Sequence, residues 1–146
     1  MGYIELVHIL KLQNLWVETD GAKGERANLD EADLEGSYLR GVNLSGAKLW
    51  RANLSGADLS CTNLEGANLA DANLLGARIC YSSFSGANLR GTKIWGVKRE
   101  GGILTIGCQS MTIDRWRGLT FTEVRDMHPL ALLWWSYNRD LILGPE

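Results

Sequence analysis

Residues 51–70 read RANLS GADLS CTNLE GANLA, and this pattern of five continues on both sides, from Arg26 to Gly96. The fourth residue of each block is large and apolar, and the residue two places before it is Ala in nine of fourteen blocks. Gly stands two places after the apolar residue in nine blocks. A helix repeats about every 3.6 residues and a strand every two, so a period of five predicts a short extended unit followed by a turn.

Such blocks cannot fold one at a time. Within a block the small and the large residue share one face, while the residue between them points away. A single block buries almost nothing, so the blocks must stack into a solenoid in which the large residues form columns. Gly suits the tight bend between blocks because it tolerates backbone angles that other residues avoid. Most of the conspicuous residues are therefore predicted to be structural.

Blocks of the form A(N/D)LxG, as in GADLS, GANLA and GANLR, resemble the pentapeptide-repeat family, and the resemblance covers about half of the chain. It implies an all-β solenoid, a right-handed four-sided β-helix with one block per side and four blocks per coil. Fourteen blocks then give about three and a half coils, or a rod roughly 17 Å tall at about 4.8 Å per layer.

The chain is predicted to have three parts: an N-terminal β cap at 1–25, the β-helix at 26–97, and a C-terminal strand and helical cap at 98–146. The apolar segments Tyr3–Leu10 and Leu15–Val17 indicate one or two strands that cover the open end of the core. Glu5 and His8 interrupt the first segment, which argues against a signal peptide. No segment is long enough to cross a membrane.

Charged residues at 98–100 end the repeat, and Ile103–Gly107 predicts a strand over the C-terminal end. The pattern becomes helical from Thr112, and Thr120 with Glu123 fits a capping box. The tail, with IGCQSMTIDRW and ALLWW, also resembles the helical tail of some cyanobacterial and phage-associated members of the family. An α-helical C-terminal cap is therefore expected.

A last helix is predicted between Pro129 and Gly144. It carries Trp134 and Trp135, which point about 100° apart on a helix. One interpretation is that both cover the hydrophobic end of the rod. The other is a contact with a partner or a homodimer through the C-terminal helix, because aromatic residues anchor interfaces.

The sequence offers little catalytic chemistry. His8 and His128 lie in opposite flanks, without a nucleophile or metal ligand nearby in sequence. Cys61, Cys80 and Cys108 have no zinc spacing, although Cys61 and Cys80 fall on neighbouring coils of one side if a coil holds twenty residues. We expect reduced thiols, and no catalytic, metal or cofactor site. The chain is predicted not to be an enzyme.

Several members of the family bind DNA-processing proteins by imitating the charge of duplex DNA, and topoisomerase-protecting resistance proteins are the best known. Duplex DNA carries one negative charge per about 1.7 Å, so a rod of roughly 17 Å would need about ten net negative charges. The repeat tract has seven acidic and seven basic residues, and the whole chain has a net charge of −2. A uniformly acidic mimic is therefore disfavoured.

A local form of mimicry remains, because four acidic residues fall in the first two blocks and would form one acidic corner. The alternative is an ordinary solvated rim. Two tryptophans in the tract follow a central apolar residue and should point outward, toward the caps or toward a partner. Direct nucleic-acid binding is not expected without a basic stripe. The predicted partner-binding residues are Asp30, Glu31, Asp33, Glu35, Trp50 and Trp95.

These features predict a non-enzymatic protein-binding module that inhibits or shields a nucleic-acid-processing protein such as a nuclease, a topoisomerase or a CRISPR effector. One version is a partial DNA mimic encoded by a phage that inhibits bacterial defence in the manner of an anti-CRISPR protein. The alternative is a cytosolic structural or scaffolding β-helix protein with no mimicry. Either version is expected in the cytoplasm, which is the host cytoplasm if the protein is phage-encoded.

Overall fold

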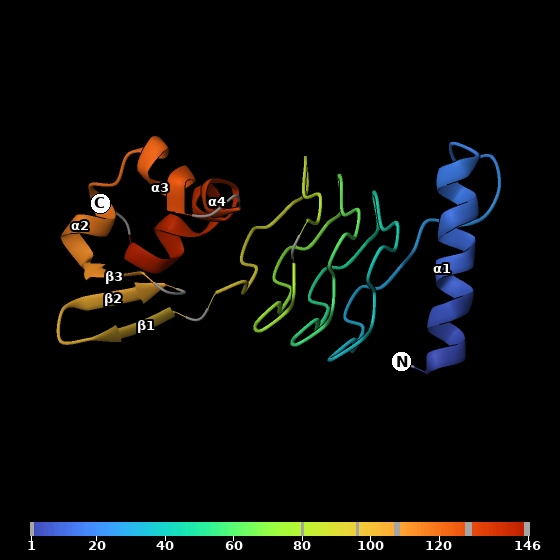
Figure 1. Cartoon of the computed structure of the whole chain (residues 1–146), viewed down its shortest axis with the longest axis horizontal. Coiled ribbons are helices and arrows are strands. Elements are labelled where there is room, and N and C mark those ends of the chain that lie inside the picture. Colours follow the sequence, from blue (N-terminus) through green and yellow to red (C-terminus); the bar gives the residue numbers. More distant parts are fainter. Residues whose placement is uncertain (1, 80, 96, 107–108, 128–129, 145–146) are drawn as a thin grey trace.

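The computed structural model is a rod and describes residues 2–79, 81–95, 97–106, 109–127 and 130–144. Helix α1 lies across one end, the repeat tract forms the middle, and a small sheet with three helices forms the other end (Figure 1). The elements are α1 (Tyr3–Glu18), β1 (Val97–Glu100), β2 (Ile103–Ile106), β3 (Gln109–Thr112), α2 (Ile113–Arg117), α3 (Phe121–Met127) and α4 (Ala131–Leu143).

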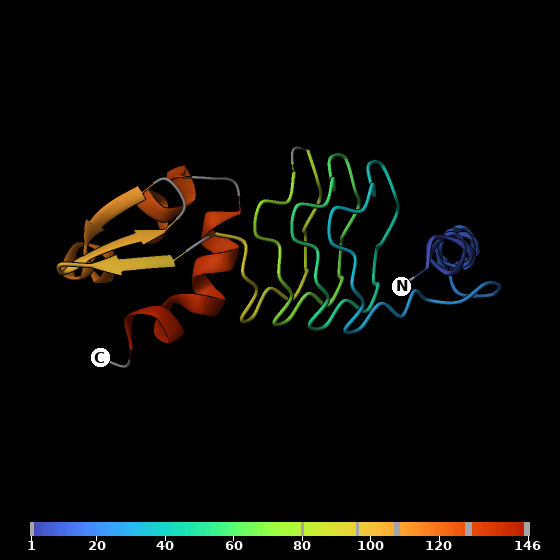
Figure 2. The same ribbon diagram turned by 90° about the horizontal axis from the view of Figure 1, so that it is seen from below.

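The repeat tract winds into a coil of twenty residues. Parallel bridges join residues twenty apart, from Asn28 with Lys48 to Asn73 with Lys93. Backbone hydrogen bonds follow the same register: the Leu29 amide donates to the Lys48 carbonyl at 2.8 Å. Four blocks therefore complete one turn, as the four-sided β-helix requires, and the coils stack along the rod (Figure 2).

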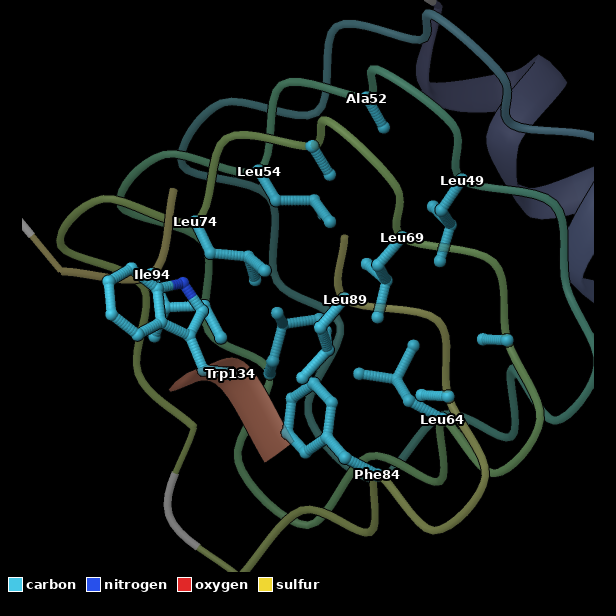
Figure 3. Close-up of a cluster of buried hydrophobic side chains, with 14 of the residues drawn as sticks. Leu49, Ala52, Leu54, Leu64, Leu69, Leu74, Phe84, Leu89, Ile94 and Trp134 are labelled. Atoms are coloured by element: carbon cyan, nitrogen blue, oxygen red, sulfur yellow. The ribbon is translucent and has the colours of Figure 1, made fainter. Parts of the chain in front are cut away.

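The large apolar residues fill the inside of this coil. The central residues Leu39, Leu44, Leu49, Leu54 and Leu59 are fully buried at 0% exposure, and Ala47, Ala52 and Ala57 are buried beside them. Figure 3 shows Leu49, Ala52 and Leu54 among the side chains that point into one shared interior. Burying a Leu side chain contributes about 1.5–3 kcal/mol, so the stacked columns supply the main driving force for this tract.

The bends between blocks are not all made by Gly. We call the side formed by the blocks around Leu29, Leu49, Leu69 and Leu89 the first side. The corner after it carries Glu31, Arg51 and Asp71, with φ of 58°, 55° and 58°. A left-handed backbone angle costs a non-Gly residue about 1–2 kcal/mol, so the stack holds these residues in a conformation that they avoid alone. All three side chains are exposed and lie one coil apart.

The N-terminal segment is a helix, and the prediction of strands at Tyr3–Leu10 and Leu15–Val17 is wrong. The residues that pack on the core or are buried are Leu6, Ile9, Leu10 and Gln13, which have the three- and four-residue spacing of one helix face. No Gly or Pro interrupts the sixteen residues of α1. The composition is β-prone, but the spacing of the packed residues is helical, and this packing determines the structure.

Gln13 joins α1 to the start and the end of the first coil. Its Nε2 donates to the Ser45 carbonyl at 2.8 Å, and its Oε1 accepts from the Ala27 amide at 2.6 Å. The side chain is 0% exposed. One primary amide therefore satisfies a backbone donor and a backbone acceptor at the N-terminal end of the solenoid.

The C-terminal part contains the antiparallel sheet β1-β2-β3 and helices α2 to α4. Gly101 and Gly102, with φ of 54° and 79°, make the two-residue turn between β1 and β2. A strand near Ile103–Gly107 is confirmed as β2, while Gly107 falls outside the described residues. Its predicted place over the end of the rod is wrong, because α4 contacts the last coil instead. The capping box is also confirmed, since Thr120 Oγ1 accepts from the Glu123 amide and Glu123 Oε2 accepts from the Thr120 amide at 2.9 Å.

Helix α4 lies across the last coil. It ends at Gly144 as predicted, whereas Pro129 falls outside the described residues. Trp134 donates its indole N–H to the Thr92 carbonyl at 2.6 Å, and its ring lies beside Ile94 in Figure 3. Asn138, one turn further, donates to the Leu89 carbonyl at 3.2 Å. The final coil therefore gains side-chain donors for two of its carbonyls.

Candidate functional site

Four acidic side chains are exposed on the first coil, where the sequence predicted a corner. We call Asp30, Glu31, Asp33 and Glu35 the acidic corner. Asp30 and Glu31 belong to the first side and the bend after it, and Asp33 and Glu35 lie on the next side. The four carboxylates therefore occupy two neighbouring sides at the α1 end of the rod.

Hydrogen bonds to the second coil position three of these carboxylates. Asp30 Oδ1 accepts from the Trp50 amide at 2.8 Å. Asn53 Nδ2 donates to Asp33 Oδ1 at 3.1 Å and to Glu35 Oε2 at 3.3 Å. Asn53 Oδ1 in turn accepts from Asn73 Nδ2 at 3.1 Å. The corner is thus a positioned array rather than four independent surface side chains.

The fourth carboxylate has a cationic neighbour. Glu31 Oε1 lies 3.6 Å from Arg51 Nη1, and both side chains are more than half exposed, at 60% and 58%. An exposed ion pair of this kind contributes at most about 1 kcal/mol and weakens with salt. Glu31 is therefore partly neutralised in the free protein but remains available for another cation.

Trp50 lies beside the corner and is 37% exposed. The Arg51 guanidinium lies 5.0 Å from the centre of its ring, within the range of a cation–π contact. The side chain points outward, as the sequence predicted. Its ring adds an apolar surface one coil away from Asp30, in the column formed by Asp30, Trp50, Ala70 and Arg90.

Trp95 lies at the opposite end of the rod from the acidic corner. It is half-buried and meets Trp134 edge to face, with the ring centres 5.1 Å apart. Its described contact is therefore with the C-terminal cap, which was one of the two roles expected for it.

Trp134 and Trp135 are both buried within the chain, at 3% and 4% exposure. Trp135 packs on Trp116 of α2 with ring centres 5.3 Å apart, while Trp134 faces the coil. Tyr137 is the more exposed aromatic residue of this helix, at 42%. The two indoles hold the cap together and leave little surface for a second molecule.

The described residues contain no group of three His, Cys, Asp or Glu side chains that could hold a metal ion. His8 is exposed on α1, and Cys61 is an exposed free thiol. His128, Cys80 and Cys108 fall outside the described residues. An open cavity of about 520 Å³ lies in the C-terminal part, lined by residues such as Trp135, Ser136 and Arg139. It lies far along the rod from the acidic corner (Figure 1).

Sequence reasoning missed the residues that position the corner. Arg51, Asn53 and Asn73 stand twenty or forty residues after the positions they support, and each lies in an outward-pointing or corner column. A comparison of residues twenty apart would have found them, because this spacing places side chains directly above one another. None of the helices in the described residues is long and apolar enough to span a membrane.

The family model described as "Pentapeptide repeats (8 copies)" matches residues 25–60 and 57–96. A pentapeptide repeat protein of known structure from Nostoc PCC 7120 is 36% identical over 58% of this chain and 74% of that one, with a TM-score of 0.34. HetL from Nostoc sp. strain PCC 7120, involved in heterocyst differentiation regulation, is 40% identical over 47% of this chain, with a TM-score of 0.27.

QnrB1, a plasmid-mediated fluoroquinolone resistance protein, is 25% identical over 50% of this chain and 49% of that one, with a TM-score of 0.30. The match to HetL covers 36% of HetL, so the likeness between this chain and HetL is confined to part of both molecules. No curated protein sequence gives a significant match.

Proposed function

Because this chain belongs to the pentapeptide-repeat family, we propose that it is a non-enzymatic binding module that inhibits or shields a nucleic-acid-processing protein. Proteins of this family are generally non-catalytic. The proposed contact is the acidic corner together with Trp50. The observation that carries the proposal is the positioning of Asp30, Asp33 and Glu35 by hydrogen bonds to the second coil.

Positioned carboxylates suit a partner that normally binds phosphates. Proteins that process nucleic acids line their binding surfaces with Lys and Arg, which pair with carboxylates as well as with phosphate groups. Side chains held in place before binding lose less conformational entropy when the complex forms. Trp50 adds an aromatic anchor at the edge of the charged area.

The proposed mimicry is local. The repeat tract has equal numbers of acidic and basic residues, and Arg78, Arg90 and Lys93 belong to its later coils. A basic groove would be repelled by that end of the rod. The partner is therefore expected to contact the end nearest α1 and to leave the C-terminal part free.

A topoisomerase, a nuclease and a CRISPR effector are the partner classes to test, and each implies a cytoplasmic protein, in the host cytoplasm if a phage encodes it. The first experiment is a pulldown of the full chain from bacterial lysate at low and at raised salt. Purified DNA gyrase in a supercoiling assay and a purified CRISPR effector nuclease in a cleavage assay then test two classes directly.

The decisive variant reverses Asp33 and Glu35 to Lys, because both side chains are exposed on the same coil. We expect binding and inhibition to be lost while the circular dichroism spectrum is unchanged. The matched control is Glu65→Lys, an exposed acidic residue on another side of the same tract. Equal binding by the wild type and the Asp33, Glu35 variant would exclude the acidic corner as the contact.

A scaffolding role without mimicry is the second candidate. This candidate is favoured by contacts within the chain, because Asn53 donates a hydrogen bond to Asp33 and Arg51 forms an ion pair with Glu31. In that case no nucleic-acid-processing protein is recovered at low salt. Neither purified enzyme is inhibited at a high molar excess of the full chain.

A further inference from the structure

We infer that the first side of the solenoid is an interface for a second, antiparallel copy of this chain. This surface shares Asp30, Glu31 and Trp50 with the proposed partner contact. The inference does not rest on that function, because it uses only how the charges of one side are distributed along the rod. The kind of partner is fixed by charge complementarity between the two ends of that side.

The first side presents three outward columns, each with one residue per coil. The bridges from Asn28 to Lys48, Asn68 and Asn88 fix the register of the first column, and the other two follow two and three residues later along each coil. The second column is Asp30, Trp50, Ala70 and Arg90, and the corner column is Glu31, Arg51, Asp71 and Gly91.

An antiparallel copy related by a twofold axis across the rod meets each column with the same column in reverse order. Asp30 then faces Arg90 of the second copy, and Arg51 faces Asp71 of the second copy. Each of these contacts occurs twice by symmetry. Trp50 faces the small Ala70, where an indole can be accommodated.

No like charges meet among the described residues of these three columns. Glu31 faces Gly91, and Lys48 faces Asn68, so the remaining charges of the first side oppose neutral residues. A parallel copy would instead place each coil against itself, with Asp30 and Glu31 meeting the same acidic coil. Because like charges in contact oppose association, the antiparallel arrangement is selected.

Two of the other three sides do not have this property. The side with Tyr38, Asp58 and Arg78 has its middle coil opposite itself, so Asp58 would meet Asp58. The side with Asn43 and Asn63 would similarly place Glu65 against Glu65. The remaining side has one complementary contact, since Asp33 would face Lys93, but its Glu35 would face Trp95, which already contacts the C-terminal cap. The first side has two such contacts, Asp30 with Arg90 and Arg51 with Asp71, and is therefore the more self-complementary side.

The side chains that the pairing needs are accessible. Asp30, Arg51, Asp71 and Arg90 are all exposed, and Trp50 is 37% exposed. The face is only four coils tall, so it offers less than the roughly 1,200–2,000 Å² buried by a stable complex. The dimer is therefore a weak one that depends on concentration and on ionic strength.

The test uses two variants of the full chain, Asp30→Arg and Arg90→Asp. Alone, each variant places like charges opposite one another at both symmetric contacts. In an equimolar mixture, the substituted side chain of the Asp30→Arg variant faces the substituted side chain of the Arg90→Asp variant, and these two have opposite charges. At the second contact of that pair, an unchanged Arg90 faces an unchanged Asp30. Mixing two defective variants should therefore restore association.

Sedimentation velocity at about 0.5 mM protein and about 50 mM salt measures the dimer, and about 500 mM salt should dissociate it. Each single variant should weaken association roughly tenfold or more, since both symmetric contacts change from attractive to repulsive. The mixture should return to within about threefold of the wild type. Thermal unfolding of each variant checks that the loss of the Asp30 bond to Trp50 leaves the chain folded.

Glu65→Arg is the matched control and should leave association unchanged. A wild-type chain that remains monomeric at low salt overturns the inference, and so does a mixture no more associated than its components. The proposed inhibitory function would fail differently, because loss of enzyme inhibition by Asp33→Lys with Glu35→Lys does not depend on mixing variants.

Discussion

Single residues in the repeat tract have roles set by their column. A residue that points inward is one of a stack of equivalents, as with Leu39, Leu59 and the other fully buried leucines. A residue that points outward or lies at a bend contacts side chains one coil above or below it, the residue beside it or, at the ends of the rod, a cap. The same substitution should therefore have very different effects at positions only a few residues apart.

Leu59→Ala should destabilise the solenoid by about 2–5 kcal/mol, because Leu59 is fully buried and the stacked coils cannot collapse around the cavity. Leu75→Ala is the matched control, since that side chain is 37% exposed in the same tract. It should change stability by no more than about 0.5 kcal/mol. Urea unfolding followed by circular dichroism measures both. Equal midpoints would contradict the assignment of columns.

Gln13→Leu should destabilise the N-terminal end, because it leaves the Ala27 amide and the Ser45 carbonyl without their side-chain partner. Each buried group left unsatisfied costs about 1–3 kcal/mol. Hydrogen exchange at the Ala27 amide should accelerate clearly. Asn14→Leu, on the exposed side of the same helix, serves as the control. Unchanged exchange at Ala27 would show that α1 contributes no cap.

The inward columns could be predicted from the sequence because a five-residue period leaves no other arrangement for the large apolar residues. The role of Gln13 could not, since a single Gln within an apolar segment carries no sign of the backbone groups that it meets. The acidic corner was visible as a cluster, but its supporting residues Arg51 and Asn53 lie in later blocks. Their involvement depends on the coil length.

At the scale of elements, the ends of the rod differ from its middle. Tyr3–Glu18 has a composition typical of strands and forms a helix, because its packed residues share one helix face. The C-terminal helices were predictable because local signals mark them, such as the Thr112 cap on α2 and the capping box before α3. Local hydrogen bonds can be read from neighbouring residues, whereas packing on a distant surface cannot.

The C-terminal part should lose stability in acid through Glu123. Hydrogen bonds from the Thr120 amide, from Arg115 and from the Thr120 hydroxyl lower the pKa of Glu123 from 4.5 to about 2. A lowered folded-state pKa gives stability that is present above about pH 4.5 and lost as the pH falls toward 2. The ion pair to Arg115, at 2.5 Å, is broken over the same interval.

Thermal unfolding followed by tryptophan fluorescence, repeated at several pH values between 7 and 2.5, measures this loss of stability. Glu123→Gln should be less stable than the wild type at pH 7, and the difference should shrink as the pH falls. Glu65→Gln in the solenoid is the control. A constant difference between Glu123→Gln and the wild type across this range would contradict the role of the carboxylate.

At the scale of the whole molecule, the twenty-residue coil couples the two ends. Helix α1 contacts the first coil through Gln13, and α4 contacts the last coil through Trp134 and Asn138. Each cap therefore meets a particular side of the square. The number of blocks between the caps sets their relative rotation about the rod axis.

Deletion of residues 56–75 removes one full coil and should preserve every column and both caps, giving a shorter rod that unfolds in one transition. Deletion of residues 61–65 removes only one block, so all later residues rotate by one side. The shorter deletion should therefore be the more damaging one. Circular dichroism melting and Trp fluorescence measure this order, and a more stable five-residue deletion would contradict it.

The covering of the first coil has a consequence for the protein's tendency to form fibres. Asn28, Asp33 and Tyr38 of the first coil each form a bridge to the second coil. The opposite, outer edge of the first coil is therefore a template on which another extended chain could add. Gln13 and α1 occupy part of that template. Proteolytic loss of the N-terminal helix would convert a rod of fixed length into a seed for end-to-end polymerisation.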